Sequence, residues 1–351
     1  MPIEDEVGQE SSEVIPFRYA ITSYGADYPV DSLVKRLKNG AIFTPTFQRK
    51  YVWKLPQASK FIESLLLGLP VPGVFFARDE ETQKLLIIDG QQRLLTLQFF
   101  YEGIFAATGR QFQLTGVQEQ FKGLTYKALS GEDRLRLDDS IIHATITQQD
   151  EPSDDNSSIY HIFERLNTGG TPLSSQEIRA CIYHGPFSDL LKDLNKDSSW
   201  RAILGRENTR MKDQELILRF LALTSELGSY ARPMKGFLNT FMGRHRWLKK
   251  QEASEFRECF ENTIEVIYSA IGKRSFKPFS SVNAAVFDAV MVGVARRLES
   301  GHIKDVDSLR SRYEELLSNT TFHEAYQQGT ADETKLQTRA DLAIKAFGHI
   351  Q

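Results

Sequence analysis

The first 150 residues alternate short apolar runs with stretches of helical apolar spacing, a pattern that predicts a mixed α+β domain. Residues Val30 to Leu37 have helical spacing, and Gly40 after them favours a helix end. Pro56 stands at a typical first helical position and predicts a second helix. The apolar runs Val74 to Arg78 and Leu85 to Ile88 flank a polar tip, so they predict a β-hairpin.

The pattern becomes almost entirely helical further along the chain. The last strand candidates are Gln111–Leu114 and Ile141–Thr147, and the polar stretch 148–157 after them predicts a loop or linker. A helix is expected over Ser158–Leu166, and the sequence Ser-Ser-Gln-Glu at 174–177 is typical of a capping box. Further helices are expected near residues 213–227, 234–250, 253–271, 282–299, 305–318 and 332–347. We therefore expect three segments: an acidic, disordered lead (1–17), a mixed domain (18–150) and an all-α helical bundle (151–351).

Composition adds that the chain is globular, with room for two cores. Of its 351 residues, 25% are charged and 41% hydrophobic, and the net charge is −3. This charge gives no global attraction to nucleic acid or to an anionic membrane, so such contacts need a local patch. The only cysteines, Cys181 and Cys259, exclude a disulfide framework and favour a reducing compartment. No apolar run approaches the roughly 20 residues that span a bilayer, so we expect a cytoplasmic protein.

Several common catalytic motifs are absent from the sequence. The pair Gly272-Lys273 is followed by Arg274, so it does not form a Walker A loop. The sequence has no G-x-G-x-x-G, G-x-S-x-G or H-E-x-x-H motif and no paired C-x-x-C. Its seven histidines are scattered, without the neighbours expected of an HNH-type nuclease. The candidate chemistry therefore has to come from less common patterns.

The most informative pattern is the polar stretch Asp89 to Arg93 between the strand Leu85 to Ile88 and an apolar helix. The first amides of a helix have no intrahelical partner and carry about half a positive charge, which favours an anion. Arg93 adds a planar, permanently charged donor suited to phosphate. The structural alternative is an Asp-x-x-Gln capping box, with Asp89 as N-cap and Gln92 as its partner. Because capping needs neither Gln91 nor Arg93, we expect their loss to cost function more than fold.

Two further segments concentrate polar side chains. Gln48 and Arg49 lie among alternate aromatic residues that are typical of one packed face of a strand or loop. Residues 167–170 (Asn-Thr-Gly-Gly) are consistent with a helix C-cap and turn, or with a backbone nest that binds an anion. Either segment is a candidate wall of a binding site.

A basic cluster on or just before one predicted helix is the candidate nucleic-acid surface, with phosphate contacts and aromatic stacking as the chemistry. The alternative is an ordinary solvated helix face. Lys273, Arg274 and Lys277 would support a nucleic-acid surface if they folded onto the same side. The cluster consists of Arg232, Lys235, Arg244, His245, Arg246, Lys249 and Lys250.

Three motifs, taken in order, resemble a known family. They are Phe47-Gln48-Arg49-x-Tyr51-x-Trp53, Ile88-Asp89-Gly90-Gln91-Gln92-Arg93, and residues 163–174, Phe-Glu-Arg-Leu-Asn-Thr-Gly-Gly-Thr-Pro-Leu-Ser. Together they are similar to the N-terminal half of GmrSD-type modification-dependent restriction enzymes. That family is similar in fold to the ParB and sulfiredoxin group, whose phosphate-binding motif lies at a strand-to-helix turn. In such proteins this α+β unit binds, and in several cases hydrolyses, nucleoside triphosphates.

The resemblance implies roles for individual residues. Asp89, Gln92 and Arg93 would be catalytic, with Asp89 at the Mg²⁺ ion or the attacking water and Arg93 at the phosphates. The remaining nucleotide-binding residues would be Gln48, Arg49, Gly90, Gln91, Arg165, Asn167, Gly169 and Gly170.

Full-length members of this family append an HNH nuclease domain, and no such motif is found in this chain. We therefore expect a sensor or regulatory subunit of a prokaryotic antiphage restriction system that binds and hydrolyses a nucleoside triphosphate with Mg²⁺. A nuclease subunit, modified or phage DNA and a second copy of the chain are candidate partners. The alternatives are a non-catalytic DNA-binding module and a ParB-like nuclease.

Overall fold

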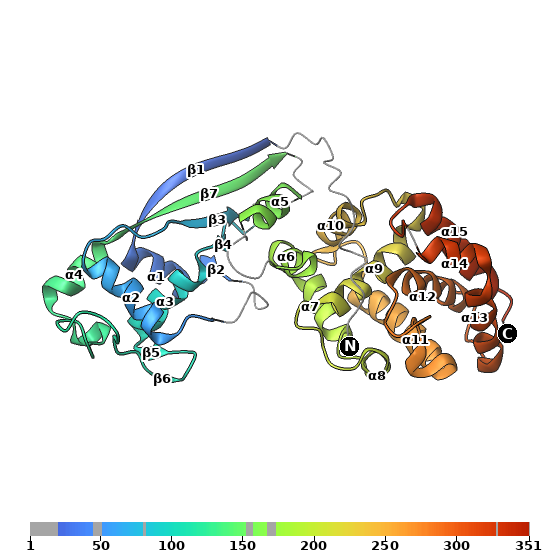
Figure 1. The fold of residues 1–351 in the computed structure, drawn as a ribbon. Coiled ribbons are helices and arrows are strands. Elements are labelled where there is room, and N and C mark those ends of the chain that lie inside the picture. The colour runs from blue at the N-terminus through green and yellow to red at the C-terminus, as the bar shows by residue number, and fades with distance from the viewer. Residues whose placement is uncertain are drawn as a thin grey trace. The chain divides into compact units, whose positions relative to one another are not determined.

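The computed structural model describes residues 20–44, 51–79, 82–151, 157–166, 173–327 and 329–350. These residues form two compact units, with the division between Leu173 and Ser174. The first unit is a mixed sheet with helices and the second is helical (Figure 1), which confirms the predicted fold class. The predicted acidic lead over residues 1–17 lies outside the described residues.

The first unit contains seven strands and five α-helices within its described residues. Its strands are β1 (Ala20–Pro29), β2 (Ile42–Phe43), β3 (Val74–Arg78), β4 (Leu85–Asp89), β5 (Ile104–Phe105), β6 (Arg110–Gln111) and β7 (Ile141–Glu151). Its helices are α1 (Val30–Lys38), α2 (Leu55–Leu66), α3 (Gln91–Glu102), the 3-10 helix η2 (Tyr126–Ala128), α4 (Gly131–Asp139) and α5 (Ser157–Leu166).

Five of these strands form one mixed sheet in the order β1-β7-β3-β4-β2. β7 is antiparallel to β1 and parallel to β3, and β3 is antiparallel to β4, which confirms the predicted hairpin. In this arrangement Val74 at the start of β3 pairs with Ala144, and Asp89 at the end of β4 pairs with Phe75. The end of β4, the start of β3 and the first half of β7 therefore share one end of the sheet.

One face of the sheet carries the core of this unit. Phe76, Ile87 and Ile146 are fully buried in a cluster with apolar residues of α1, α2 and α3. Because strand side chains alternate between faces, the buried Leu86 and Ile88 point to the opposite side. α5 contacts β4 and β7 on this second side. Burial on both faces explains why β4 is an uninterrupted apolar run.

The strand predictions differ from the structure at two places. β7 continues to Glu151, four residues into the stretch predicted as a loop, because its end pairs with the start of β1. The predicted strand Gln111–Leu114 is wrong except at its first residue, since β6 covers only Arg110–Gln111. α5 belongs to the first unit, whereas the change in composition near residue 150 predicted that this helix is part of the helical bundle.

The second unit is entirely helical in its described residues. The helices are α6 (Ser175–Ile182), α7 (Pro186–Leu194), α8 (Ser198–Leu204), α9 (Lys212–Glu226), η3 (Leu227–Ser229), α10 (Met234–His245), α11 (Ala253–Ile271), η4 (Gly272–Arg274), α12 (Ala284–Leu298), α13 (Val306–Ser318), α14 (Thr320–Gln327) and α15 (Glu333–Phe347). The six predicted helices of this region are confirmed, and the predicted capping box forms at α6, where Ser174 and Glu177 cap reciprocally. The short helices α7, α8 and α14 were not predicted.

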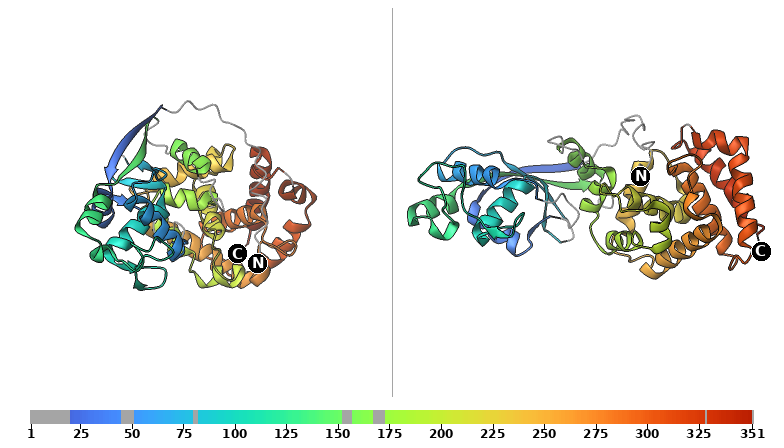
Figure 2. Two further views of the ribbon diagram at one scale, coloured as in Figure 1. Left: turned by 60° about the vertical axis from the view of Figure 1, so that its left-hand side comes forward. Right: turned by 60° about the horizontal axis from the view of Figure 1, so that its bottom comes forward.

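α12 is the central helix of this unit, in contact with α9, α11 and α15 (Figure 1). Figure 2 shows the helices of this unit from two further sides. It crosses α15 closely at Gly293, where an added Cβ would lie 2.8 Å from the carbonyl carbon of Ala343. Asp288 on the same helix accepts hydrogen bonds from Nε of Arg219 at 3.1 Å and from Nη2 at 2.5 Å, and it lies 3.6 Å from Nη2 of Arg339. Burial and the neighbouring Arg219 lower the pKa of Arg339 to about 10. A single buried carboxylate thus compensates the positive charge of two buried arginines.

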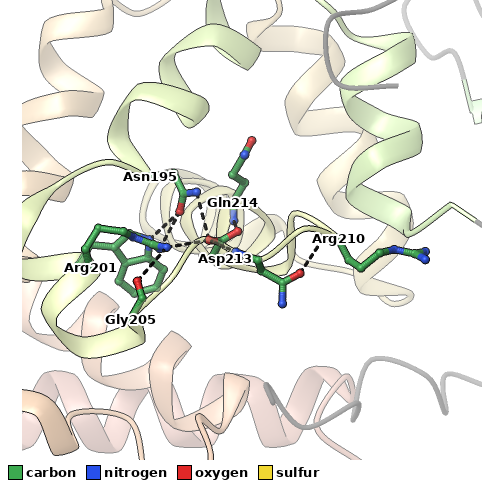
Figure 3. Close-up of polar contacts among 8 residues, drawn as sticks. Asn195, Arg201, Gly205, Arg210, Asp213 and Gln214 are labelled. Atoms are coloured by element: carbon green, nitrogen blue, oxygen red, sulfur yellow. Dashed lines mark hydrogen bonds and ion pairs between the residues drawn. The ribbon is translucent and has the colours of Figure 1, made fainter. Parts of the chain in front are cut away.

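A second buried polar network joins α7, α8 and α9 around Asp213 (Figure 3). Oδ2 of Asp213 accepts hydrogen bonds from Asn195 at 3.1 Å, Arg201 at 3.0 Å and the amide of Asn208 at 3.0 Å. Its other oxygen accepts the amide of Gln214 at 3.0 Å. Because all four partners point at one buried carboxylate, we assign this network to stability. Among the described helices, none is both long and apolar enough to cross a membrane.

Candidate functional site

Residues 89–93 span the junction of β4 and α3, as predicted: Asp89 ends the strand, Gly90 makes the turn and Gln91 begins the helix. Gly90 is the N-cap of α3 and has a left-handed backbone with a φ of 95°. A Cβ atom on this residue would lie 2.5 Å from Cγ1 of Val74. The turn therefore needs glycine both for its conformation and for its close packing on β3.

The predicted capping box does not form at this turn. The N-cap is Gly90 rather than Asp89, and it provides no side-chain hydrogen bond. Oε1 of Gln92 instead accepts the backbone amides of Val52 at 2.9 Å and Trp53 at 3.3 Å. The prediction was wrong because sequence spacing does not reveal a distant segment that packs across the first turn of α3.

Arg93 is a fixed and mostly buried cation. Its Nη1 donates to the carbonyl of Gly73 at 2.6 Å, and its Nη2 donates to Oδ2 of Asp89 at 2.6 Å. The exposed fraction is 13% for the Arg93 side chain and 48% for that of Asp89. Arg93 thus ties the start of β3 to the end of β4, and its loss should cost fold as well as function. The half-exposed Asp89 carboxylate is the group that remains open to a ligand.

The segment that packs on α3 is held by side chains as well as by Gln92. The Thr96 hydroxyl donates to the carbonyl of Gln92 at 2.7 Å, so the Tyr51 hydroxyl must donate to Thr96, also at 2.7 Å. Burial raises the pKa of Tyr51, which keeps this donor protonated. The Tyr51 ring packs edge-on against Phe99, with ring centroids 5.0 Å apart. Tyr51 and Trp53 are therefore packing residues, as the alternate aromatic pattern predicts.

The other predicted site residues are only partly placed. Gln91 is the half-buried first residue of α3, and Arg165 is exposed in the last turn of α5. The remaining predicted residues lie outside the described residues: Gln48, Arg49, Asn167, Gly169 and Gly170. A pocket assembled from this turn and the segments around residues 48–49 and 167–170 stays a prediction. Among these three segments, the β4–α3 turn is the one that lies within the described residues.

A histidine–aspartate pair lies at the same end of the sheet and was not predicted. Nδ1 of His143 on β7 lies 2.9 Å from Oδ1 of Asp27 on β1. The two residues face each other across the antiparallel pair β1–β7. They are 116 positions apart in the sequence. Only the strand register brings them together, so no local pattern could have identified the pair.

The predicted basic cluster is largely engaged within the helical unit. Arg244 forms an ion pair with Glu226 at 2.6 Å, and the backbone amide of Arg232 donates to Glu333 at 2.9 Å. The Arg232 guanidinium lies 3.6 Å from Glu333 as well. Arg246 is buried, donates to the carbonyl of His184 at 2.8 Å and stacks on Trp247. These contacts reduce the positive charge that the cluster can offer to a phosphate backbone.

Three further cations, Lys273, Arg274 and Lys277, do not join this cluster. They follow the last residue of α11, whereas Lys249 and Lys250 precede its first residue. A helix of 19 residues is about 28 Å long, so the two basic groups lie at opposite ends of α11. Lys277 also donates to the carbonyl of Ile203 at 2.7 Å. The condition for one joined basic surface is therefore not met.

The fold and the turn together define a mixed α/β domain whose strand-to-helix junction offers an uncapped helix start and a carboxylate. Residues 30–184 match the sequence model of the family described as GmrSD restriction endonuclease, N-terminal domain. The chain carries this GmrSD-type N-terminal domain, as its three motifs indicate.

The family match covers the described elements from α1 to α6, so it includes the first helix of the helical unit. It identifies the chain at a coarse level as a component of a restriction system. The chain matches none of the curated proteins compared with it.

Proposed function

We propose that this chain binds a nucleoside triphosphate together with Mg²⁺ at the β4–α3 turn and hydrolyses it as a regulatory subunit of a restriction system. The observation that carries the proposal is the half-exposed carboxylate of Asp89 beside a helix start that has no side-chain cap. A helix start with a glycine cap lets an anion approach the backbone closely. The family match supports the restriction context.

The phosphates would bind at the first turn of α3. The helix dipole contributes about half a positive charge there, and Arg93 adds a fixed cation within the same turn. Because Arg93 is held by Gly73 and Asp89, it acts mainly by fixing the turn and by its charge. A preorganised positive environment of this kind stabilises the charge that develops on phosphoryl transfer.

The residues at the turn fit a magnesium ion only in company with phosphate. Within the described ranges, no three or more histidine, cysteine or acidic side chains converge as a metal site. Mg²⁺ commonly binds to one or two carboxylates and completes its coordination with water and substrate phosphates. Asp89 can supply one such carboxylate, because one of its oxygens binds Arg93 and its side chain is half exposed. We therefore expect metal and nucleotide to bind as a complex.

The test is phosphate release from the four nucleoside triphosphates, with and without Mg²⁺ and with and without modified DNA. Asp89→Asn should abolish Mg²⁺-dependent nucleotide binding. Glu102→Gln is the matched control, because this carboxylate ends α3, about 17 Å along the helix from its first residue, and accepts a hydrogen bond from Gln98 on the exposed surface.

Nucleotide binding by isothermal calorimetry gives the complementary measurement. Mg²⁺ alone should give no binding signal, and Mg²⁺ with a nucleoside triphosphate should. If the wild-type chain binds no nucleotide under any of these conditions, or if Asp89→Asn binds as well as Glu102→Gln, the proposal is refuted.

A further inference from the structure

The connection between α11 and α12 presents an exposed aromatic ring beside two unpaired cations. It begins with η4 and ends at Asn283, the N-cap of α12. Phe279 on this connection is 59% exposed, and no other aromatic residue in the described ranges is as exposed. Lys273 and Arg274 are exposed too, and within the described part of the chain neither side chain has a hydrogen bond or ion pair. From Val266 to Phe287 the sequence holds three cations and no acid.

Buried contacts fix the backbone of this connection. Phe276 is fully buried and packs edge-on against Phe287, with ring centroids 4.9 Å apart. Its backbone is left-handed, with a φ of 64°, a conformation that a bulky residue keeps only where its surroundings hold it. Nζ of Lys277 donates to the carbonyls of Ile203 at 2.7 Å and Lys273 at 2.9 Å. The exposed ring therefore projects from a backbone that is held at several points.

Capping of α11 does not account for the two exposed cations. Cations near the end of a helix stabilise its last carbonyl groups, which have no intrahelical partner. Here Nε of Arg310 donates to the carbonyl of Ala270 at 2.7 Å, and the carbonyl of Lys273 in η4 is bound by Lys277. The side chains of Lys273 and Arg274 take no part in these contacts, so their charges are available to a ligand.

From these features we infer that the α11–α12 connection binds single-stranded DNA, with the Phe279 ring stacked on a base and Lys273 and Arg274 at neighbouring phosphates. An aromatic ring can stack on a base of any identity, because every base has a π face. Bases in a duplex are already stacked on both sides, so an exposed ring favours an unpaired strand. The Phe279 ring has no hydrogen-bond donor or acceptor, and we therefore expect little sequence preference.

The choice of DNA as the strand rests on the restriction context of the proposed function. The ring and the two cations fit the alternation of base and phosphate along any single strand. A restriction system acts on DNA, so DNA is the strand to which we commit. The binding does not depend on nucleotide hydrolysis at the β4–α3 turn, and the two proposals can therefore fail separately.

The test is the fluorescence anisotropy of a labelled oligothymidylate of about 12 nucleotides, titrated with the full chain in EDTA without nucleotide. Phe279→Ala should raise the Kd about 5–150-fold, the fold-change that corresponds to stacking on one base. Phe279→Trp should bind at least as tightly as the wild type, and the strand should quench its added indole fluorescence. Both variants should keep the wild-type melting temperature, because the side chain at this position is exposed.

The salt dependence of binding separates the phosphate contacts from stacking. Each phosphate that is neutralised on a single strand contributes about −0.7 to the slope of log K against log salt concentration. Lys273→Gln combined with Arg274→Gln should therefore make this slope less steep by about 1.4, whereas Phe279→Ala should leave it unchanged. Lys249→Gln with Lys250→Gln is the matched control, because it removes the same charge before the first turn of α11 and should leave Kd and slope near the wild-type values.

The same strand in duplex form should bind more weakly than the single strand. The inference is overturned if the wild type binds no single strand, if Phe279→Ala binds as tightly as the wild type, or if the control pair weakens binding as much as the Lys273 and Arg274 pair. Binding confined to an oligouridylate, or to phosphatidylserine vesicles, would assign the connection to RNA or to a membrane surface and would also overturn it. A wild type that binds oligothymidylate but no nucleotide refutes the proposed nucleotide site alone.

Discussion

Gly90→Ala is expected to destabilise the first unit by about 2–5 kcal/mol, because two separate penalties add at this position. The left-handed backbone, with a φ of 95°, costs a residue with a Cβ about 1–2 kcal/mol. The new Cβ would also lie 2.5 Å from Cγ1 and 3.0 Å from Cβ of Val74. Overpacking of this kind costs about 1–3 kcal/mol.

Gly103 at the other end of α3 provides the control for the backbone penalty. It is the C-cap of the helix with a φ of 79°, and nothing lies within 4 Å of an added Cβ. Gly103→Ala should therefore cost only about 1–2 kcal/mol. The difference between the two glycine variants measures the clash with Val74. Combining Gly90→Ala with Val74→Ala should recover about 1–3 kcal/mol relative to the sum of the single effects.

The measurement must read the first unit alone, since a chain with two units need not unfold in a single step. Hydrogen exchange of peptides from β4 and α3 over a urea series gives the unfolding free energy of this unit. Equal losses for the two glycine variants, or strict additivity with Val74→Ala, would refute the packing argument. The turn would then depend on backbone conformation alone.

Three further predictions concern other polar groups. Gln92→Ala should lower the free energy of unfolding by about 1–3 kcal/mol, because two backbone amides lose their acceptor. Those amides should also lose protection against hydrogen exchange, whereas Gln92→Glu, which keeps an acceptor oxygen, should retain it. Burial lowers the pKa of His245 in the folded chain. On acidification the unfolded chain therefore takes up a proton at this histidine at a higher pH than the folded chain does. The free energy of unfolding should decrease as the pH is lowered beyond about 6.5. Melts at pH 7 and pH 5 check this, and His245→Phe should show a smaller difference. Asp288→Asn should cost about 3–5 kcal/mol in urea unfolding, because Arg219 and Arg339 lose their shared anion, whereas Arg339→Met should be nearly neutral.

The helices of the second unit could be predicted from the sequence to within a few residues, because their buried faces repeat with a helical period. α11 illustrates this, since its buried residues recur every three or four positions: Phe256, Phe260, Thr263, Ile264, Ile267 and Ala270. α9 and α12 differ, because both are buried on all sides over most of their length. α7 and α8 were not predicted, because helices of 9 and 7 residues offer too few turns for a period to show. The end of β7 was missed for another reason, since polar residues there form a strand only through pairing with β1.

The sequence by itself determined where the candidate site begins, because a buried strand, a glycine and a helix follow one another within a single turn. It also determined the family, since the motifs are local. Only the tertiary structure decided what each side chain of that turn does. Gln92 binds the segment that docks on α3, Arg93 holds Gly73 and Asp89, and neither contact has a local signature. The pairing of His143 with Asp27 likewise arises from strand register, which brings together residues that spacing along the chain cannot connect.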